Sequence, residues 1–155
     1  MKVTKTLIIL FAVFLYSCDE NTPLEQESPD LRPLTSDSDL LGSWLLYETG
    51  YSPGAGYIIK KIPSTPAQLI QFKGDQTFFS NIRGYTDYKF YGVLEHPTYK
   101  SKIVAFFKSK PAPVVDINQL EAWNYVNFKG SNLALSNPRC IEGCHVGFRP
   151  LLKIK

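Results

Sequence analysis

Short runs of β-branched and aromatic residues, separated by turn residues, dominate the chain from residue 42 to its end. Such residues suit the pleated, half-buried surface of a sheet. Turn signals at a spacing of roughly 8–12 residues are typical of an all-β sandwich or barrel. No long window shows the period of an amphipathic helix. The pattern therefore predicts one all-β domain.

Nine segments carry the strand pattern, and we interpret them as eight strands, one of them interrupted: 43–49, 57–62, 68–72, 77–82, 87–95, 102–108, 121–128, 132–136 and 145–154. Turn residues at 73–76 and 129–131 predict hairpins. Eight antiparallel strands can close into an up-and-down barrel without exposed edges. The interior of such a barrel is filled by side chains or holds one small ligand, and the sequence leaves both alternatives open.

The first 17 residues have the pattern of an export signal. Lys2 and Lys5 precede an uncharged apolar stretch from Leu7 to Leu15. This stretch is shorter than the roughly 20 apolar residues that cross a bilayer, and its flanks fit a secretory signal. We therefore expect residues 1–17 to be a cleaved signal peptide.

The signal ends in Leu15-Tyr16-Ser17-Cys18, which resembles the lipobox of bacterial lipoproteins. The resemblance implies cleavage before Cys18, acylation of its thiol and amine, and a membrane as the partner of the anchor. Several acyl chains give stable anchoring where one gives reversible binding. The implied location is the envelope of a Gram-negative bacterium, at the outer membrane. The alternative is an ordinary signal peptide with an incidental cysteine.

Residues 18–39 are expected to form an acidic, flexible tether. Residues 18–41 carry seven acidic side chains and one base, Arg32, whereas residues 42–155 carry 14 bases and seven acids. The acidic segment contains three prolines and has no periodic apolar pattern. The domain is therefore expected to span residues 40–155. Its lysines are either solvated surface charges or a cluster at one barrel mouth that faces anionic lipid or acidic glycan.

Three short motifs resemble those of the lipocalin-like lipoproteins of Gram-negative bacteria. Residues 41–46 contain the Gly42-x-Trp44 motif of these barrels, residues 70–78 contain an aromatic, Gly-Asp, aromatic pattern, and a Cys140–Cys144 segment precedes the final strand. The resemblance implies an antiparallel, up-and-down, eight-stranded lipocalin-like barrel. It also implies that Trp44 plugs the closed end, while Gly42 lets the chain turn closely into its strand.

Cys140 and Cys144 form an even pair once Cys18 is assigned to lipid. An exported protein meets an oxidising compartment, so a disulfide is the expected state. A metal site that uses the adjacent His145 is the alternative, although neighbouring residues of an extended chain point to opposite faces.

The sequence does not indicate catalysis. It contains two histidines, no Gly-x-Ser-x-Gly elbow and no Gly-rich phosphate loop before a helix. No catalytic residue, metal, cofactor or nucleic-acid partner is expected. The candidate ligand contacts are aromatic: Tyr51, Tyr57, Tyr91 and Trp123, among a wider set that includes Tyr85, Tyr88 and Tyr125. Alternation along 88–95 places Tyr88, Phe90, Gly92 and Leu94 on the expected core face.

Two functions from different classes follow. The first is a lipid-anchored envelope module that binds a small hydrophobic or amphipathic ligand. The second is an accessory envelope lipoprotein with a filled barrel that docks on a partner protein or glycan. A cavity with aromatic walls inside the barrel would favour the first function, and a filled barrel with an exposed apolar patch would favour the second. The sequence does not determine the oligomeric state.

Overall fold

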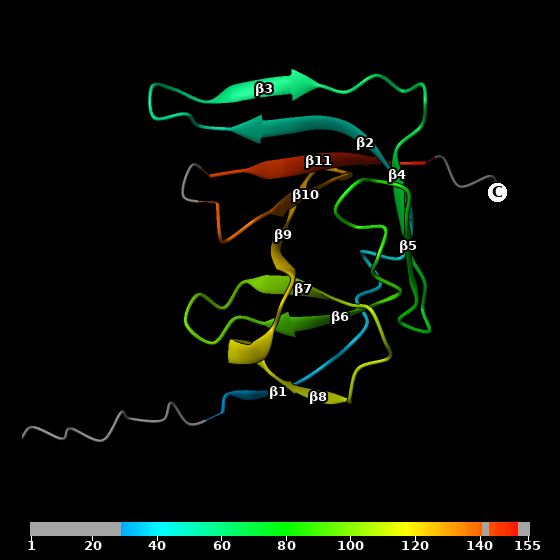
Figure 1. Ribbon diagram of the computed structural model, residues 1–155, viewed down its shortest axis with the longest axis vertical. Helices are drawn as coiled ribbons and strands as arrows, with labels where there is room; N and C mark the ends of the chain where they lie inside the picture. The colour runs from blue at the N-terminus through cyan, green and yellow to red at the C-terminus, as the bar shows by residue number, and fades with distance from the viewer. Residues whose placement is uncertain (1–28, 141–142, 152–155) are drawn as a thin grey trace, which may run out of the picture.

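The computed structural model describes residues 29–140 and 143–151 (Figure 1). Cys18, the expected signal peptide and most of the expected tether lie outside these residues. The described chain is all-β apart from one 3-10 turn, η2 (Ile117–Gln119). The strands are β1 (Leu31–Pro33), β2 (Gly42–Tyr51), β3 (Ile58–Lys61), β4 (Leu69–Phe72), β5 (Phe78–Ser80), β6 (Phe90–Glu95), β7 (Lys102–Phe107), β8 (Val114–Asp116), β9 (Trp123–Lys129), β10 (Asn132–Ser136) and β11 (His145–Pro150).

Eight of these strands form a nearly closed antiparallel barrel in up-and-down order. The path runs β2-β4-β5-β6-β7-β9-β10-β11, and β11 pairs with β2. Strands β5 and β6 meet at a single bridge between Thr77 and Phe90. The hairpins predicted at 73–76 and 129–131 connect β4 to β5 and β9 to β10. The predicted all-β, eight-stranded antiparallel barrel is confirmed.

Strands β3 and β4 together occupy one position beside β2. Strand β4 pairs with the first half of β2, from Gly42 to Leu45, and β3 pairs with the second half, from Glu48 to Tyr51. The proline-containing segment 62–68 separates the two strands because proline interrupts the hydrogen-bond ladder of a sheet. The sequence predicts one interrupted strand, and the structure places the interruption between β3 and β4. In Figure 1, β3 is the outermost strand and lies on the side of β2 away from β11, so that β2 and β3 form an outer ribbon.

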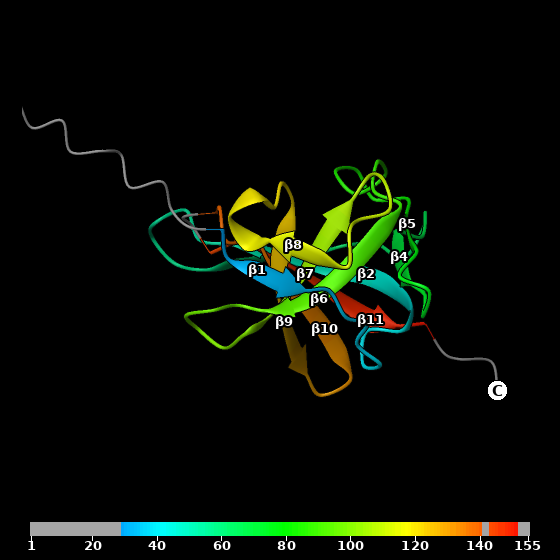
Figure 2. The same ribbon diagram turned by 90° about the horizontal axis from the view of Figure 1, so that it is seen from below.

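A second apolar layer covers the outer face of β6, β7 and β9. Strands β1 and β8 form a separate two-stranded sheet, which lies in front of β6 and β7 when the molecule is viewed from below (Figure 2). The apolar residues between the layers are Leu94, Ile103, Ala105, Ile117 and Leu120. Neither β1 nor β8 was predicted.

The expected domain boundary at residue 40 is too late. Within the expected tether, β1 is paired with β8, Thr35 forms a backbone bridge with Val93, and Asp37 is buried beside Lys102. The domain therefore begins by residue 30, and the flexible-tether prediction is wrong for residues 31–39. No helix within the described ranges is long and apolar enough to cross a membrane.

Candidate functional site

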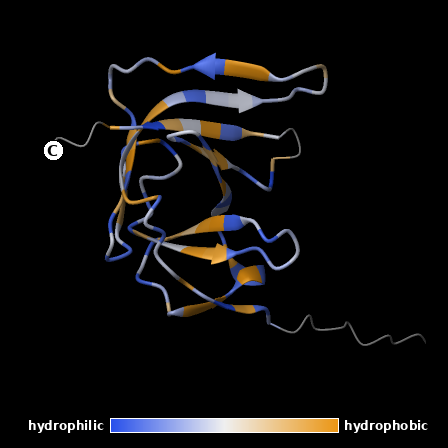
Figure 3. Cartoon of the chain, turned by 180° about the vertical axis from the view of Figure 1, so that it is seen from behind, coloured by the Kyte–Doolittle hydropathy of each residue, from blue (hydrophilic) through white to orange (hydrophobic). Residues whose placement is uncertain are grey.

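The barrel interior is filled by side chains. Phe72 lies at the centre of an aromatic stack, with ring centroids 5.2 Å from Phe78 and 4.9 Å from Tyr91. Phe106 continues the stack, 4.9 Å from Phe78. Leu133, Leu135 and Phe148 are fully buried in the same cluster. In Figure 3, apolar colour runs along the strands that surround this region.

Tyr91 belongs to this core, so its assignment as a ligand contact is wrong. Its side chain is fully buried, and its hydroxyl donates a hydrogen bond to the carbonyl of Lys73 at 2.9 Å. Burial raises the pKa of Tyr91 to about 12. The predicted core face of β6 is also wrong, because Tyr91 and Val93 point into the barrel while Leu94 packs in the second layer.

A cavity of about 300 Å³ lies next to the barrel core and combines aromatic with polar lining. Its aromatic lining comes from Tyr85, Tyr88, Phe106 and Trp123, and its polar lining includes Glu121, Asn124, Asn137 and Arg139. The Tyr85 ring packs edge-on against Phe106, with centroids 5.2 Å apart, and Tyr88 lies 5.8 Å from the same ring. We call this cavity the mouth cavity.

A buried amide and a phenol are hydrogen-bonded to each other in the wall of the mouth cavity. Asn124 is 6% exposed, and its Nδ2 donates to the hydroxyl of Tyr85 at 3.1 Å. Burial raises the pKa of Tyr85, although the bond from Asn124 opposes this effect. The Tyr85 hydroxyl therefore stays protonated at neutral pH and retains its own proton for donation to another acceptor.

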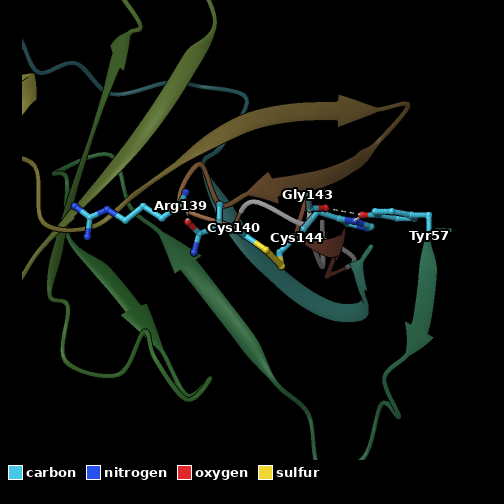
Figure 4. Close-up of a disulfide and its surroundings, with 7 residues drawn as sticks. Tyr57, Arg139, Cys140, Gly143 and Cys144 are labelled. Carbon is cyan, nitrogen blue, oxygen red and sulfur yellow. Dashed lines mark hydrogen bonds between the residues drawn. A yellow bond between two sulfur atoms is a disulfide. The ribbon is translucent and has the colours of Figure 1, made fainter. Parts of the chain in front are cut away.

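The loop between β10 and β11 supplies one rim of the mouth cavity. Cys140 and Cys144 form a disulfide within it, as predicted. In Figure 4, the Arg139 side chain points away from the disulfide, and its Nη2 donates to the carbonyl of Leu120 at 3.2 Å. The backbone N–H of Asn137 donates to the carbonyl of Cys144 at 3.1 Å. The disulfide thus closes residues 140–144, and Asn137 and Arg139 lie directly before this closed segment.

Tyr51 and Tyr57 lie apart from the mouth cavity, on the ribbon of β2 and β3, and are 41% and 50% exposed. The Tyr57 ring stacks on His145, with centroids 5.6 Å apart, and its hydroxyl contacts His145 Nδ1 and the carbonyl of Gly143 (Figure 4). The opposite ring nitrogen of His145 lies 3.4 Å from Glu48, which pairs with Lys61 at 2.5 Å. Tyr57 therefore connects β3 to the disulfide loop.

Trp123 lies between two environments. It lines the mouth cavity, packs against the second apolar layer, and has its ring centroid 5.2 Å from that of Tyr125. His96 and Tyr99, from the β6–β7 loop, complete an aromatic surface cluster, in which Tyr99 is 67% exposed. Of the four predicted ligand contacts, only Trp123 lies at the mouth cavity.

Gly42 and Trp44, for which structural roles are predicted, lie at the start of β2. Gly42 begins β2 with a φ of 125°, a conformation that favours glycine. Trp44 is 6% exposed, and its indole Nε1 donates to the carbonyl of Leu40 at 2.8 Å. Trp44 is therefore part of the filled core and has a buried hydrogen-bond partner.

A second cavity of about 560 Å³ lies between the segment 32–38 and strands β6 and β7. The Asp37 carboxylate accepts from Lys102 Nζ at 2.7 Å and from the N–H of Asp39 at 3.0 Å. Burial of this carboxylate raises its pKa, but the two hydrogen bonds outweigh burial and hold the pKa below its ordinary value. Asp37 and Lys102, the polar side chains in this wall of the second cavity, are thus hydrogen-bonded to each other.

The lysines do not gather at one mouth of the barrel. Lys60 and Lys61 lie on β3, in the outer ribbon, whereas Lys100 and Lys102 lie at the β6–β7 hairpin. Lys61, Lys100 and Lys102 are each ion-paired with a carboxylate. Within residues 29–140 and 143–151, no group of three His, Cys, Asp or Glu side chains is placed to hold a metal ion.

Tyr85, Tyr88 and Trp123 are among the aromatic residues that the sequence suggests as ligand contacts. The sequence does not suggest the polar lining residues Asn124, Asn137 and Arg139. Asn124 lies on β9, and Asn137 and Arg139 follow β10, so the β9–β10 hairpin brings these three residues together. Tyr85 and Tyr88 come from the segment between β5 and β6, so no local spacing marks the whole set. The predicted disulfide between Cys140 and Cys144 is the one feature of the sequence that indicates an ordered loop at this rim of the mouth cavity.

Comparisons with known protein families, with curated proteins and with solved structures find no match.

Proposed function

We propose that this chain is a lipid-anchored envelope protein that binds a sugar ring of an envelope glycan at the mouth cavity. The observation that carries the proposal is the combination of a filled barrel interior with a cavity that pairs aromatic rings with amide, carboxylate and guanidinium groups. A filled interior leaves no room for a hydrophobic ligand of the usual barrel type.

The chemistry of the mouth cavity fits a neutral, hydroxyl-rich ligand. Aromatic faces present an apolar surface to the C–H face of a ring, while Asn124, Asn137 and Arg139 offer donors for its hydroxyl oxygens. A volume of about 300 Å³ is at the lower end of small-molecule sites, which range from about 300 to 1,000 Å³. The cavity therefore suits one or two sugar rings rather than a long acyl chain.

A titration with soluble mono- and disaccharides, followed by calorimetry and by tyrosine and tryptophan fluorescence, tests the proposal. We expect Arg139→Ala to weaken binding by roughly tenfold, because it removes a charged hydrogen-bond donor. Arg149→Ala is the matched control, since Arg149 is exposed on β11 and does not line the cavity. Failure of every sugar to bind, or an equal effect of the two variants, would contradict the proposal.

The lipid anchor has its own test. Cells fed a clickable fatty acid should label the wild-type protein and leave Cys18→Ser unlabelled. Equal labelling of both proteins would remove the anchor from the proposal and leave the sugar site untouched.

A second candidate function is docking on a protein partner, and the aromatic surface cluster favours it. Exposed tyrosine and tryptophan side chains are enriched at protein interfaces, and Tyr99 is largely exposed beside His96, Trp123 and Tyr125. Cross-linking in intact cells, with a photoreactive residue in place of Tyr99, separates this function from sugar binding.

A further inference from the structure

Asn124 is a buried polar residue on the barrel side of β9, where it lines the mouth cavity. Its backbone pairs with Val104 of β7, and its side chain is nearly buried. Val126, two residues further along β9, belongs to the barrel core. Because side chains alternate along a strand, Asn124 shares the face of Val126. The strand therefore holds the amide in the wall of the cavity and away from bulk solvent.

Tyr85 meets this amide from the segment between β5 and β6. Its backbone N–H donates to the carbonyl of Ile82 at 2.9 Å. Its ring packs edge-on against Phe106, and its centroid lies 6.5 Å from that of Phe78. Backbone and ring are thus both held, and they place the hydroxyl beside Asn124 Nδ2.

Most of the hydrogen-bonding capacity of these two side chains is unused. An amide side chain has two N–H donors and an acceptor oxygen, and a phenol has one donor and an acceptor oxygen. Within residues 29–140 and 143–151, the bond between Asn124 and Tyr85 is the one hydrogen bond that either side chain makes. Asn124 Oδ1 is not among the fully buried polar atoms that lack a partner in these ranges, so it is open to the cavity. The wall therefore presents a free acceptor, Asn124 Oδ1, near a free donor, the Tyr85 hydroxyl.

This donor and acceptor determine which chemical group can enter next to them. Buried polar groups are almost always hydrogen-bonded, and one that loses its partner is costly. A ligand group that satisfies both side chains must accept from Tyr85 and donate to Asn124 Oδ1. A hydroxyl does both, whereas an ether or carbonyl oxygen only accepts and a C–H group does neither.

We propose that the Asn124–Tyr85 pair makes the mouth cavity selective for sugars with a free hydroxyl at the ring position that faces the pair. This inference rests on the sugar site of the proposed function and names the group that the site recognises. A ring that carries a glycosidic bond, an ether or no oxygen at this position cannot donate to Asn124 Oδ1. The bound ring is therefore one that is unsubstituted at this position.

Calorimetric titration with methyl glycosides tests the proposal. The parent compounds are the methyl glycosides of glucose, galactose, mannose and N-acetylglucosamine. Each parent that binds is compared with its monodeoxy and mono-O-methyl derivatives. We expect a ring position at which removal or methylation of the hydroxyl weakens binding by roughly tenfold or more, because the buried partners are left unpaired. This comparison uses the wild-type protein and does not depend on the folding of a variant.

Tyr85→Phe assigns this discrimination to the pair, because it removes the hydroxyl and keeps the ring against Phe106. We expect it to weaken binding of the parent glycoside by roughly tenfold and to change binding of the matching deoxy sugar by less than about twofold. Tyr88→Phe is the matched control, since Tyr88 lines the same cavity and packs on the same ring, whereas Asn124 donates to Tyr85. The control should preserve the wild-type preference for the parent over the deoxy sugar.

Loss of this preference in Tyr85→Phe alone supports the proposal. Equal affinity of the wild type for a parent and all its derivatives would overturn it, as would a preference that Tyr85→Phe leaves intact or that Tyr88→Phe reduces equally. In these three results a glycoside still binds, so the sugar site of the proposed function stands. Failure of every glycoside to bind would overturn the sugar site and the selectivity together.

Discussion

Asp37 shows how one buried carboxylate positions a segment that has no periodic pattern. Its side chain is 9% exposed and joins the chain before β2 to Lys102 on β7. Because hydrogen bonds from Lys102 and Asp39 stabilise the ionised form against the cost of burial, the folded pKa lies below the ordinary value of 3.8. The pair therefore holds the second layer on the barrel in a pH-dependent manner.

We expect Asp37→Asn to lower the free energy of unfolding by about 1 kcal/mol at pH 7. A lowered folded pKa means that the stabilisation is fully present above the unfolded pKa, near 3.8, and is lost as the pH falls through the folded pKa. The difference between variant and wild type should shrink below about pH 4 in urea titrations. Asp87→Asn is an exposed control, and a difference that is constant with pH would contradict the argument.

The His145 and Tyr57 side chains pack directly over Gly50 and leave no space for a side chain at this position. A Cβ at this position would clash with the imidazole of His145 and lie 2.7 Å from the Tyr57 hydroxyl. We expect Gly50→Ala to cost about 1–3 kcal/mol in urea unfolding, because overpacking forces neighbouring side chains to move. Gly74→Ala is the control, since a Cβ there meets nothing within 4 Å. An equal effect of both substitutions would show that chain entropy, and not the clash, is responsible.

Side-chain alternation predicted the strands better than it predicted their faces. Residues 90–95 do form β6, but Tyr91, Val93 and Leu94 are all buried. Because the second layer covers the outer face of β6, both faces are apolar, and alternation loses its meaning when neither face is solvated. The misassignment of Tyr91 as a ligand contact follows from the same cause.

At the scale of elements, the loop between β10 and β11 links the disulfide to the mouth cavity. The N–H of Cys140 donates to the carbonyl of Asn137 at 3.2 Å, and that of Gly143 donates to Cys140 at 3.0 Å. Gly143 adopts a φ of 69°, which glycine accommodates without strain. Backbone hydrogen bonds thus join Asn137 to both cysteines of the closed segment, and Arg139 lies between Asn137 and Cys140.

Replacing both cysteines, Cys140→Ser with Cys144→Ser, should lower stability by roughly 2 kcal/mol, since the disulfide closes a short loop. If the sugar site is correct, the same variant should bind sugar more weakly even where it is fully folded, because the donors of Asn137 and Arg139 lose their placement. Chemical unfolding and calorimetry measure the two effects separately. Undiminished binding by the folded variant would show that the disulfide does not position the site.

The hairpins were predictable because their turns are local, whereas β1 and β8 were not. Strands β1 and β8 have three residues each, and β1 ends at Pro33. The two strands pair with each other although they are far apart in the sequence. A strand this short has no detectable period, and acidic, proline-containing sequence around it is typical of disordered linkers. Long-range pairing thus overrides a local pattern that indicates a tether.

At the scale of the whole molecule, the second layer makes residues 30–39 part of the domain. A chain that begins at residue 40 lacks β1, the Thr35–Val93 bridge and the Asp37–Lys102 pair. Leu94 and Ile103, both nearly or fully buried, would lose part of their cover. We expect the free energy of unfolding of residues 40–155 to be lower than that of residues 29–155 by at least about 3 kcal/mol.

Urea unfolding and binding of a hydrophobic dye compare these two fragments. The shorter fragment should bind the dye at neutral pH because its second layer is exposed, and the longer one should not. If both fragments unfold at the same urea concentration, the segment before residue 40 contributes nothing to the fold.

The up-and-down path also determines when the barrel can close. Every neighbouring pair along it joins consecutive barrel strands except β2 with β11, where Trp44 pairs with Pro150 near the other end of the chain. During synthesis, β2 can acquire β3 and β4 early, but its other edge waits until on the order of 100 further residues have followed. An unpaired edge is a template for association with another chain. The interval between synthesis of β2 and of β11 is therefore the period in which this protein is most exposed to aggregation.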